Sequence, residues 1–342
     1  MGSLWDIAGK EVRDSFSSKK FLLLLGLFLL FSFGSVYMGF SDYQMQMEQF
    51  RSGNVYGAIP EKPSLMEVFR PLLDMRMSLA AGILSIVLGY NAISAEREKE
   101  TIEMLLSYPI YRDEVLNGKF VGGMFNLSTA LLIAFTAATG FAIYLTGVVP
   151  SMAQLSRLSF IWLGTVIYMG FFLGLGIFFS TIFRSSWRSL AATSFMLLLF
   201  LSTPFLANVA ADKIYSFDQS GSPGPGVGGG REVIVRGTSA GMAVGGSVGG
   251  SDGTIGPSEE EMQRRKVMRN REQFRETVSR LSPSTSYSNY VTEMLAQDYD
   301  EESVKPTMRQ SIFSAGGYLV YLVSQTILIF TLSYIVFMRQ DL

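Results

Sequence analysis

The chain consists of long apolar stretches separated by shorter charged ones. Six stretches contain no Asp, Glu, Lys or Arg, and each approaches or exceeds the roughly 20 residues that an apolar helix needs to cross a bilayer. A buried helix of a water-soluble protein would account for one such stretch but not for all six. We therefore predict an all-α polytopic membrane protein with six transmembrane helices. The predicted spans are Phe21–Phe40, Met77–Ala95, Phe120–Val148, Leu158–Phe183, Ser189–Ala210 and Ile312–Met338.

Residues 1–20, which precede the first span, have the pattern of an amphipathic helix. Trp5, Val12 and Phe16 recur at helical spacing, and the charged residues lie largely elsewhere. Such a helix lies in the membrane interface with its aromatic side chains inserted. Both a simple anchor and a further functional role fit this pattern. The leader is too long for the start of a signal peptide, and no A-x-A cleavage site follows it, so we expect the first span to be retained.

The positions of Lys and Arg predict how the spans are oriented, because cytoplasmic loops carry an excess of positive charge. These residues are frequent in the leader, in the loops after spans 2 and 4, and in the C-terminal tail, whereas the loop after span 3 contains only Arg157. The loop after span 1 contains both signs and argues weakly for the opposite orientation. We expect both termini to be cytoplasmic, in the cell membrane of a prokaryote. The deciding residues are Lys10, Arg13, Lys19, Lys20, Arg97, Lys99, Arg112, Lys119, Arg184, Arg188 and Arg339.

This topology divides the chain into four parts. They are the interfacial helix at 1–20, spans 1 to 5 at 21–211 with a cytoplasmic loop at 95–119, an extracytoplasmic segment at 212–311, and span 6 with a short cytoplasmic tail at 312–342.

The extracytoplasmic segment has two regions of different composition. Residues 219–257 are rich in Gly and Ser, which favours a flexible excursion. Residues 258–297 are predicted to be helical. A charged helix over Ser258–Leu281 is ended by Pro283, and a second short helix follows around Val291–Gln297. The apolar stripe of the charged helix fits packing on the chain itself, and it also fits the binding of a partner.

The composition excludes several kinds of chemistry. Only 17% of the 342 residues are charged, and the chain has no Cys and no His. It therefore has no disulfide, no thiol nucleophile, no His-ligated metal site and no Ser-His-Asp relay. The predicted spans lack the charges that an ion or proton relay needs, and a net charge of −1 gives no sign of nucleic-acid binding. No G-x-x-x-x-G-K-[ST] motif is present, so the energy for any uphill movement must enter from another subunit.

The cytoplasmic loop at 95–119 is the most informative part of the sequence. Five alternating charges from Glu96 to Glu100 come first, Leu105 and Leu106 then form a small apolar patch, and Pro109 ends this helix. An exposed apolar patch on a helix between two spans fits docking into a groove of another protein. Insertion of the same turn into the lipid interface fits as well.

The string E-R-E-x-x-T-I-E-x-L-L-S-x-P-I-x-R-x-E-V-x-x-G-K in this loop resembles the cytoplasmic loop of type-2 ABC exporter permeases, also called type V ABC exporters. In that family the loop holds the coupling helix, which contacts the nucleotide-binding subunit. The interfacial helix, the six spans and the segment LSPSTSYSNY before the last span are similar to the family as well. The outer segment departs from the family, because compact members have only a short re-entrant hairpin there. The matching positions are Glu96, Thr101, Glu103, Leu105, Leu106, Pro109, Arg112, Gly118 and Lys119.

The resemblance implies a permease subunit that pairs with a second copy or a paralogue, contacts membrane lipid, and binds an ABC ATPase that holds the ATP and Mg²⁺. No catalytic residue, cofactor or metal is expected in this chain. Leu105 and Leu106 would provide apolar docking, and Arg184 and Arg188 a second cytoplasmic contact. The charged contacts would come from Glu96, Glu98, Glu100 and Arg112.

Three functions fit these patterns. The first is ATP-driven export of an unidentified, amphipathic substrate. The second is a mechanotransmitting subunit that passes ATPase work to an extracytoplasmic partner. The third is a membrane scaffold without transport, whose outer helix binds a partner.

Overall fold

The computed structural model describes most of the chain, and every regular element in the described part is an α-helix. The described residues are 2–52, 63–98, 112–214, 259–295 and 308–339. Among them are six helices that are long and apolar enough to cross a membrane, which confirms the six spans expected from the apolar stretches. The chain is therefore a multi-pass membrane protein. The six helical stretches are Phe21–Ser52, Arg76–Glu98, Glu114–Thr146, Met152–Ile182, Ser186–Ile214 and Phe313–Arg339.

The helices divide between two compact units, which are described separately. The first unit contains Met1–Pro204 and Val278–Leu342, and the second contains Phe205–Thr277. In chain order the helices are α1 (Gly2–Ser17), α2 (Lys19–Ser52), α3 (Met66–Leu73), α4 (Met75–Gly89), α5 (Ser94–Glu98), α7 (Arg112–Thr146), α8 (Met152–Ile182), α9 (Ser186–Ile214), α10 (Glu259–Arg280), α11 (Pro283–Leu295) and α12 (Met308–Arg339).

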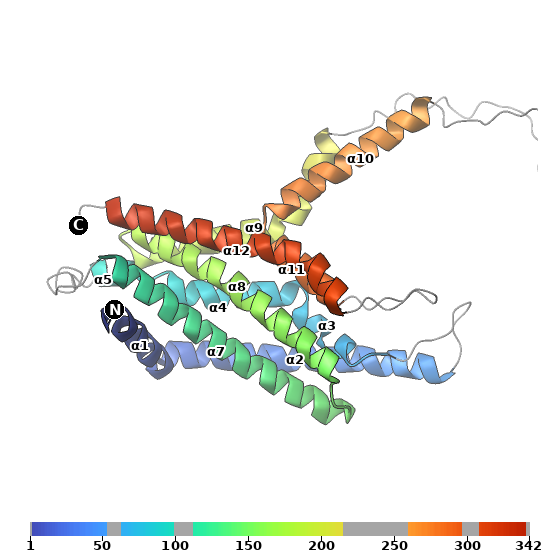
Figure 1. Cartoon of the computed structure of the whole chain (residues 1–342), viewed down its shortest axis with the longest axis horizontal. Coiled ribbons are helices and arrows are strands. Elements are labelled where there is room, and N and C mark those ends of the chain that lie inside the picture. The colour runs from blue at the N-terminus through green and yellow to red at the C-terminus, as the bar shows by residue number, and fades with distance from the viewer. Residues whose placement is uncertain (1, 53–62, 99–111, 215–258, 296–307, 340–342) are drawn as a thin grey trace, which may run out of the picture. The chain divides into compact units, whose positions relative to one another are not determined.

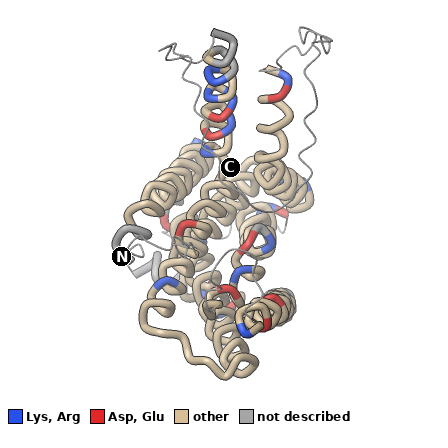
Figure 2. Tube along the Cα trace, turned by 90° about the vertical axis from the view of Figure 1, so that its right-hand side faces the viewer, with Lys and Arg blue, Asp and Glu red and all other residues tan. Residues whose placement is uncertain are grey.

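Helix α8 lies at the centre of the first unit and packs against α4, α7, α11 and α12 (Figure 1). Within its most apolar stretch 78% is buried, compared with 17% to 56% in the other five spans. The remaining spans therefore keep wide apolar faces for lipid or for another subunit. Figure 2 shows that the long helices carry few charges over most of their length, as a hydrocarbon environment requires.

Glycines allow the backbones of α4 and α8 to touch. A Cβ atom at Gly176 would lie 2.9 Å from the carbonyl carbon of Gly89, and a Cβ at Gly89 would lie 2.8 Å from the carbonyl oxygen of Leu173. Even alanine does not fit at such distances. Helices in membranes associate through this kind of close packing, because lipid removes the hydrophobic driving force between them.

The start of α11 differs from the one that the sequence predicts. The sequence predicts that Pro283 ends the charged helix and that a second helix begins near Val291. The helix begins at Pro283 itself, since proline fits the first position of a helix, where its missing N–H is not needed. Ser282 lies just before it, and its Oγ accepts a hydrogen bond from the backbone N–H of Thr285 at 3.4 Å. The Ser282-Pro283 pair, which the sequence predicts to be a break in the helix, therefore begins the next helix.

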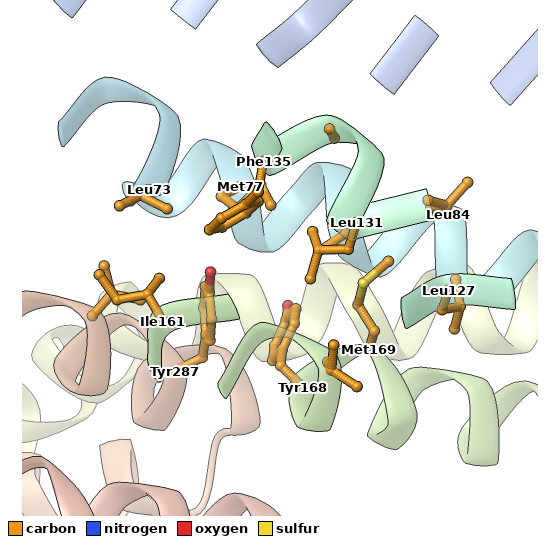
Figure 3. Packing of buried hydrophobic residues seen from close by; sticks show 14 of the residues in the cluster. Leu73, Met77, Leu84, Leu127, Leu131, Phe135, Ile161, Tyr168, Met169 and Tyr287 are labelled. Atoms are coloured by element: carbon orange, nitrogen blue, oxygen red, sulfur yellow. The ribbon is translucent and has the colours of Figure 1, made fainter. Parts of the chain in front are cut away.

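Helix α11 packs along α8 through buried tyrosines. The Tyr168 and Tyr287 rings stack with centroids 4.6 Å apart (Figure 3), and the Tyr287 hydroxyl lies 2.9 Å from Thr165 Oγ1. The Tyr290 hydroxyl donates to the Phe160 carbonyl at 2.6 Å. These contacts satisfy the buried hydroxyls, which would otherwise be costly, and they align α11 with the half of α8 that precedes Tyr168.

The corner between α10 and α11 is bonded to the middle of two spans. Gln325 of α12 donates through Nε2 to the carbonyls of Arg280 and Leu281, at 3.4 and 3.2 Å. Ser282 donates to the Phe200 carbonyl of α9 at 2.9 Å. Pro204 has no N–H with which to bond that carbonyl within the helix, so Ser282 replaces the missing donor. The carbonyl groups of Phe200, Arg280 and Leu281 therefore keep hydrogen-bond partners although they lack a helical donor.

The described part of the second unit comprises the end of α9 and most of α10. Helix α10 is strongly polar along its length, and Arg271 pairs with Asp212 inside this unit.

Replacing Gly176 with alanine tests the α4–α8 contact. Because the added methyl group meets the Gly89 backbone, Gly176→Ala should lower the free energy of unfolding by about 1 to 3 kcal/mol. Gly140→Ala is the matched control, since no atom lies within 4 Å of its Cβ position and alanine favours a helix. Thermal unfolding of the detergent-solubilised chain measures both, and equal midpoints would contradict the close approach.

Candidate functional site

The described residues on either side of the segment 99–111 lie at one end of the first unit, where α1, α5 and the start of α7 meet (Figure 1). Glu96, Glu98, Gly118 and Lys119 are described, as are Val12, Phe16, Arg184 and Arg188. The helical backbone at Trp5 and Arg112 is described but their side chains are not. Glu100, Thr101, Glu103, Leu105, Leu106 and Pro109 lie outside the described residues.

Lys119 is the centre of a charged cluster that joins three helices. Its Nζ lies 2.7 Å from Glu11 Oε1 on α1 and 2.8 Å from Glu96 Oε1 on α5. Only 9% of the Lys119 side chain is exposed, compared with 34% for Glu11 and 24% for Glu96. A buried ammonium group needs such partners, because its desolvation is costly. The cluster therefore fixes α1 and α5 against the first turns of α7.

Helix α1 packs on α7, in addition to any contact that it makes with lipid. Ala8 is buried, and a Cβ atom at Gly122 would lie 2.9 Å from Glu11 Cβ and 3.1 Å from the Ala8 carbonyl oxygen. Val12 and Phe16 are half-buried, and the Phe16 ring packs edge-on against Phe21 at 5.1 Å. The amphipathic leader thus has a protein contact on the α7 side.

The turn between α4 and α5 is bonded to the end of α8. Ser180 Oγ accepts hydrogen bonds from the backbone N–H groups of Ile93 and Ser94, both at 2.8 Å. These donors lack intrahelical acceptors because the helix has just restarted. Arg97 donates to the Thr181 carbonyl at 2.9 Å, which satisfies one of the last carbonyls of α8. Helix α5 is therefore held by α8 as well as by Lys119.

Glu98 links the same short helix to the loop between spans 4 and 5. Its Oε1 accepts from the backbone N–H of Ser186 at 2.7 Å, and its Oε2 accepts from the Ser186 hydroxyl at 2.9 Å. Ser186 is the first residue of α9, and a carboxylate is favourable at a helix N-terminus. The loop after span 2 and the loop after span 4, which are far apart in the sequence, are thus joined directly.

The loop between spans 4 and 5 also exposes charged and aromatic side chains. Arg184 and Arg188 are exposed, and they flank Trp187, whose side chain is 73% exposed. A tryptophan at this position fits the aromatic belt of a membrane protein and also the core of a protein interface.

The sequence singles out Lys119, Glu96 and Glu98 as contacts for a partner subunit, and the structure shows that they also bond residues within the chain. The sequence gives no sign of the groups that bond this loop and the turn before it. Glu11, Ser180 and Ser186 are ordinary residue types in their local sequence, and no spacing relates them to the loop. Gly122 was detectable only as one of several glycines in span 3. Among the described residues, no group of three Asp or Glu side chains could hold a metal ion.

The two helices that flank the segment 99–111 are bonded to several other helices. The segment 99–111, which contains Leu105 and Leu106, begins directly after α5 and ends at α7. Its two flanking helices are bonded to each other through Lys119, to α1 through Glu11, and to α8 and α9 through Ser180 and Glu98. A displacement of this segment would therefore act on several helices at once.

Comparison with known proteins gives two kinds of match. A family model described as ABC-2 family transporter protein matches residues 5–342. The protein named "Probable ABC transporter permease protein NosY" from Stutzerimonas stutzeri is 31% identical over 149 residues, which are 43% of this chain and 49% of that protein. The protein of the same name from Pseudomonas aeruginosa is 30% identical over 152 residues, which are 44% of this chain and 49% of that protein. The chain thus spans about half the length of these curated relatives.

Substitution of Lys119 tests the charged cluster. Lys119→Met keeps the length and apolar stem of the side chain but leaves two carboxylates facing each other. We expect a loss of about 2 to 3 kcal/mol in the free energy of unfolding, between the values typical of exposed and buried pairs. Arg13→Met on the exposed face of α1 is the control. Thermal unfolding in detergent measures both, and a Lys119→Met midpoint equal to that of Arg13→Met would refute the structural role.

Proposed function

The chain belongs to the ABC-2 family of transporter proteins, and on this premise we propose that it couples ATP hydrolysis by a separate subunit to export of an amphipathic substrate. It is the membrane-spanning permease of an ABC transporter, with six apolar helices. The proposal adds the direction of transport, the class of substrate and the route by which force enters the membrane.

The observation that carries the proposal is the bonding on both sides of the segment 99–111. A partner that binds Leu105 and Leu106 would move α5 and the start of α7 together, because Lys119 contacts both Glu96 and the α1 residue Glu11. Glu98 would pass the same movement to α9. A loop joined to the bundle at a single point would transmit much less.

The energy source in this proposal is an ABC ATPase that binds ATP and Mg²⁺. This chain contains no phosphate-binding G-x-x-x-x-G-K-[ST] loop, so the nucleotide would be held by the partner. Glu100, Arg112, Arg184 and Arg188 would add charged contacts around the apolar docking residues. Charged groups at the rim of an interface mainly affect partner choice and association rate.

The substrate path would form between two permease subunits, either two copies or a copy and a paralogue. The most apolar stretches of α2, α9 and α12 are only 28%, 22% and 17% buried within one chain, so each has an apolar face available for a second subunit. The spans carry no charged residue over their central length, and a path lined by such helices suits an amphipathic molecule better than an ion.

Transmission of work to an extracytoplasmic partner is the second candidate. The helix α10 favours it, because this helix is strongly polar and exposes most of its described side chains. A continuous cavity across the permease dimer would support export, and a closed dimer interface would support transmission.

Substitution of the docking residues tests ATPase binding. Leu105→Asp combined with Leu106→Asp should abolish co-purification of the ATPase, since it places two charges in the apolar contact. Insertion into the membrane should be unchanged, because neither residue belongs to a span. The control is Val149→Asp with Met152→Asp, two residues at the opposite end whose side chains are 73% and 85% exposed. Undiminished ATPase recovery with the Leu105/Leu106 variant would refute the docking assignment.

Thiol labelling tests the proposed orientation, and the natural chain has no cysteine to interfere. Trp187→Cys and Met152→Cys place single thiols at exposed positions near opposite ends of spans. A membrane-impermeant maleimide should label Met152→Cys in intact cells and Trp187→Cys only after permeabilisation. The reverse pattern would place the loop at 95–119, the coupling loop of this proposal, outside the cell and exclude a cytoplasmic ATPase.

A further inference from the structure

The end of the first unit opposite the coupling loop contains a hollow with charges of both signs. It has a volume of about 610 Å³ and is lined by residues of α2, α3, α11 and the start of α4. A smaller hollow of about 270 Å³ shares Asp42 and Arg70 with it. The charged groups that line the larger one are Asp42, Arg70, Asp74 and Arg76.

These four charged side chains have few strong partners within the chain. The Arg76 guanidinium donates to the sulfur of Met38 at 3.4 Å, and thioether sulfur is a weak acceptor. Asp74 lies just before the first residue of α4, yet its side chain makes no capping bond. Arg70 pairs with Glu67 on its own helix, at 2.9 Å, and its side chain stays 58% exposed. Two carboxylates and two guanidinium groups thus face a space that can hold a ligand.

The level of the hollow along the spans indicates the kind of ligand. The uncharged run of α2 ends at Phe40 and that of α4 begins at Met77, so Asp42 and Arg76 are the first charges beyond both spans at this end. Charges at that level meet lipid head groups. Tyr37 and Met38, which lie one turn deeper on α2, are exposed apolar side chains, and these are suited to contact with acyl chains.

We propose that this hollow binds the head group of an aminophospholipid such as phosphatidylethanolamine. The phosphate is placed between the guanidinium groups of Arg70 and Arg76, which bind phosphate oxygens through fixed N–H geometry. The primary ammonium group donates to the carboxylates of Asp42 and Asp74. Phosphatidylcholine cannot donate these hydrogen bonds, and phosphatidylglycerol has no cation. The proposal does not depend on the ATPase, because the hollow and the coupling loop lie at different ends of the unit.

Native mass spectrometry of the full chain in mild detergent tests this site, with each lipid added separately. Wild-type protein should retain phosphatidylethanolamine about tenfold better than phosphatidylcholine or phosphatidylglycerol, as expected for lost charge-assisted hydrogen bonds. Asp42→Asn with Arg76→Gln should abolish this preference. Glu48→Gln with Arg51→Gln, on exposed positions of α2 outside both hollows, should leave it unchanged.

A second variant keeps the test independent of charge. Thr292→Trp fills the hollow from α11, where Thr292 is an exposed lining residue, and it should lower retention about as much as the charge variant. Equal retention of all three lipids by the wild type, or an unchanged preference in both variants, would overturn the site. Displacement of the lipid by an equal concentration of free phosphoethanolamine would assign the hollow to a soluble ligand and overturn the lipid proposal.

Discussion

The need to bond every backbone polar group governs this structure, because hydrocarbon offers no water to replace a missing partner. The spans meet it as helices. Where the chain leaves the helix within the first unit, side chains from neighbouring helices provide the partners. Ser180 accepts from the N–H groups of Ile93 and Ser94, and Gln325 donates to the carbonyls of Arg280 and Leu281. Ser282 donates to the Phe200 carbonyl, whose helical donor is removed by Pro204.

The same constraint connects the short helix α5 to the spans. The restart of the chain at α5 is possible because Ser180 bonds its first N–H groups, and α9 begins where Glu98 bonds the Ser186 N–H. Bonds that stabilise helix ends therefore also join the loop after span 2 to the loop after span 4. A buried lysine with two carboxylate partners extends this connection to α1. The contacts that stabilise this end are the same ones through which the proposed coupling would act.

The opposite end of the unit follows a different physical rule. Near Asp42 and Arg76 the apolar spans have ended, and exposed charges are tolerated because head groups and water solvate them. The two ends thus differ in how their charges are used. At the end where α1, α5 and α7 meet, the charges bond residues of other helices. The charges around the hollow of α2, α3, α4 and α11 instead face a space that can hold a ligand.

The sequence alone determined the six spans, since length and the absence of charge decide what can cross a bilayer, and it pointed to Lys119, Glu96 and Glu98 through the pattern of one loop. It misplaced the start of α11, because Ser282-Pro283 fits a break and a helix start equally well. Only the tertiary structure brought Glu11, Ser180 and Ser186 to that loop and placed Asp42 and Arg76 around one hollow. Local spacing cannot reveal such contacts, which arise when helices from distant parts of the chain pack together and satisfy one another's polar groups.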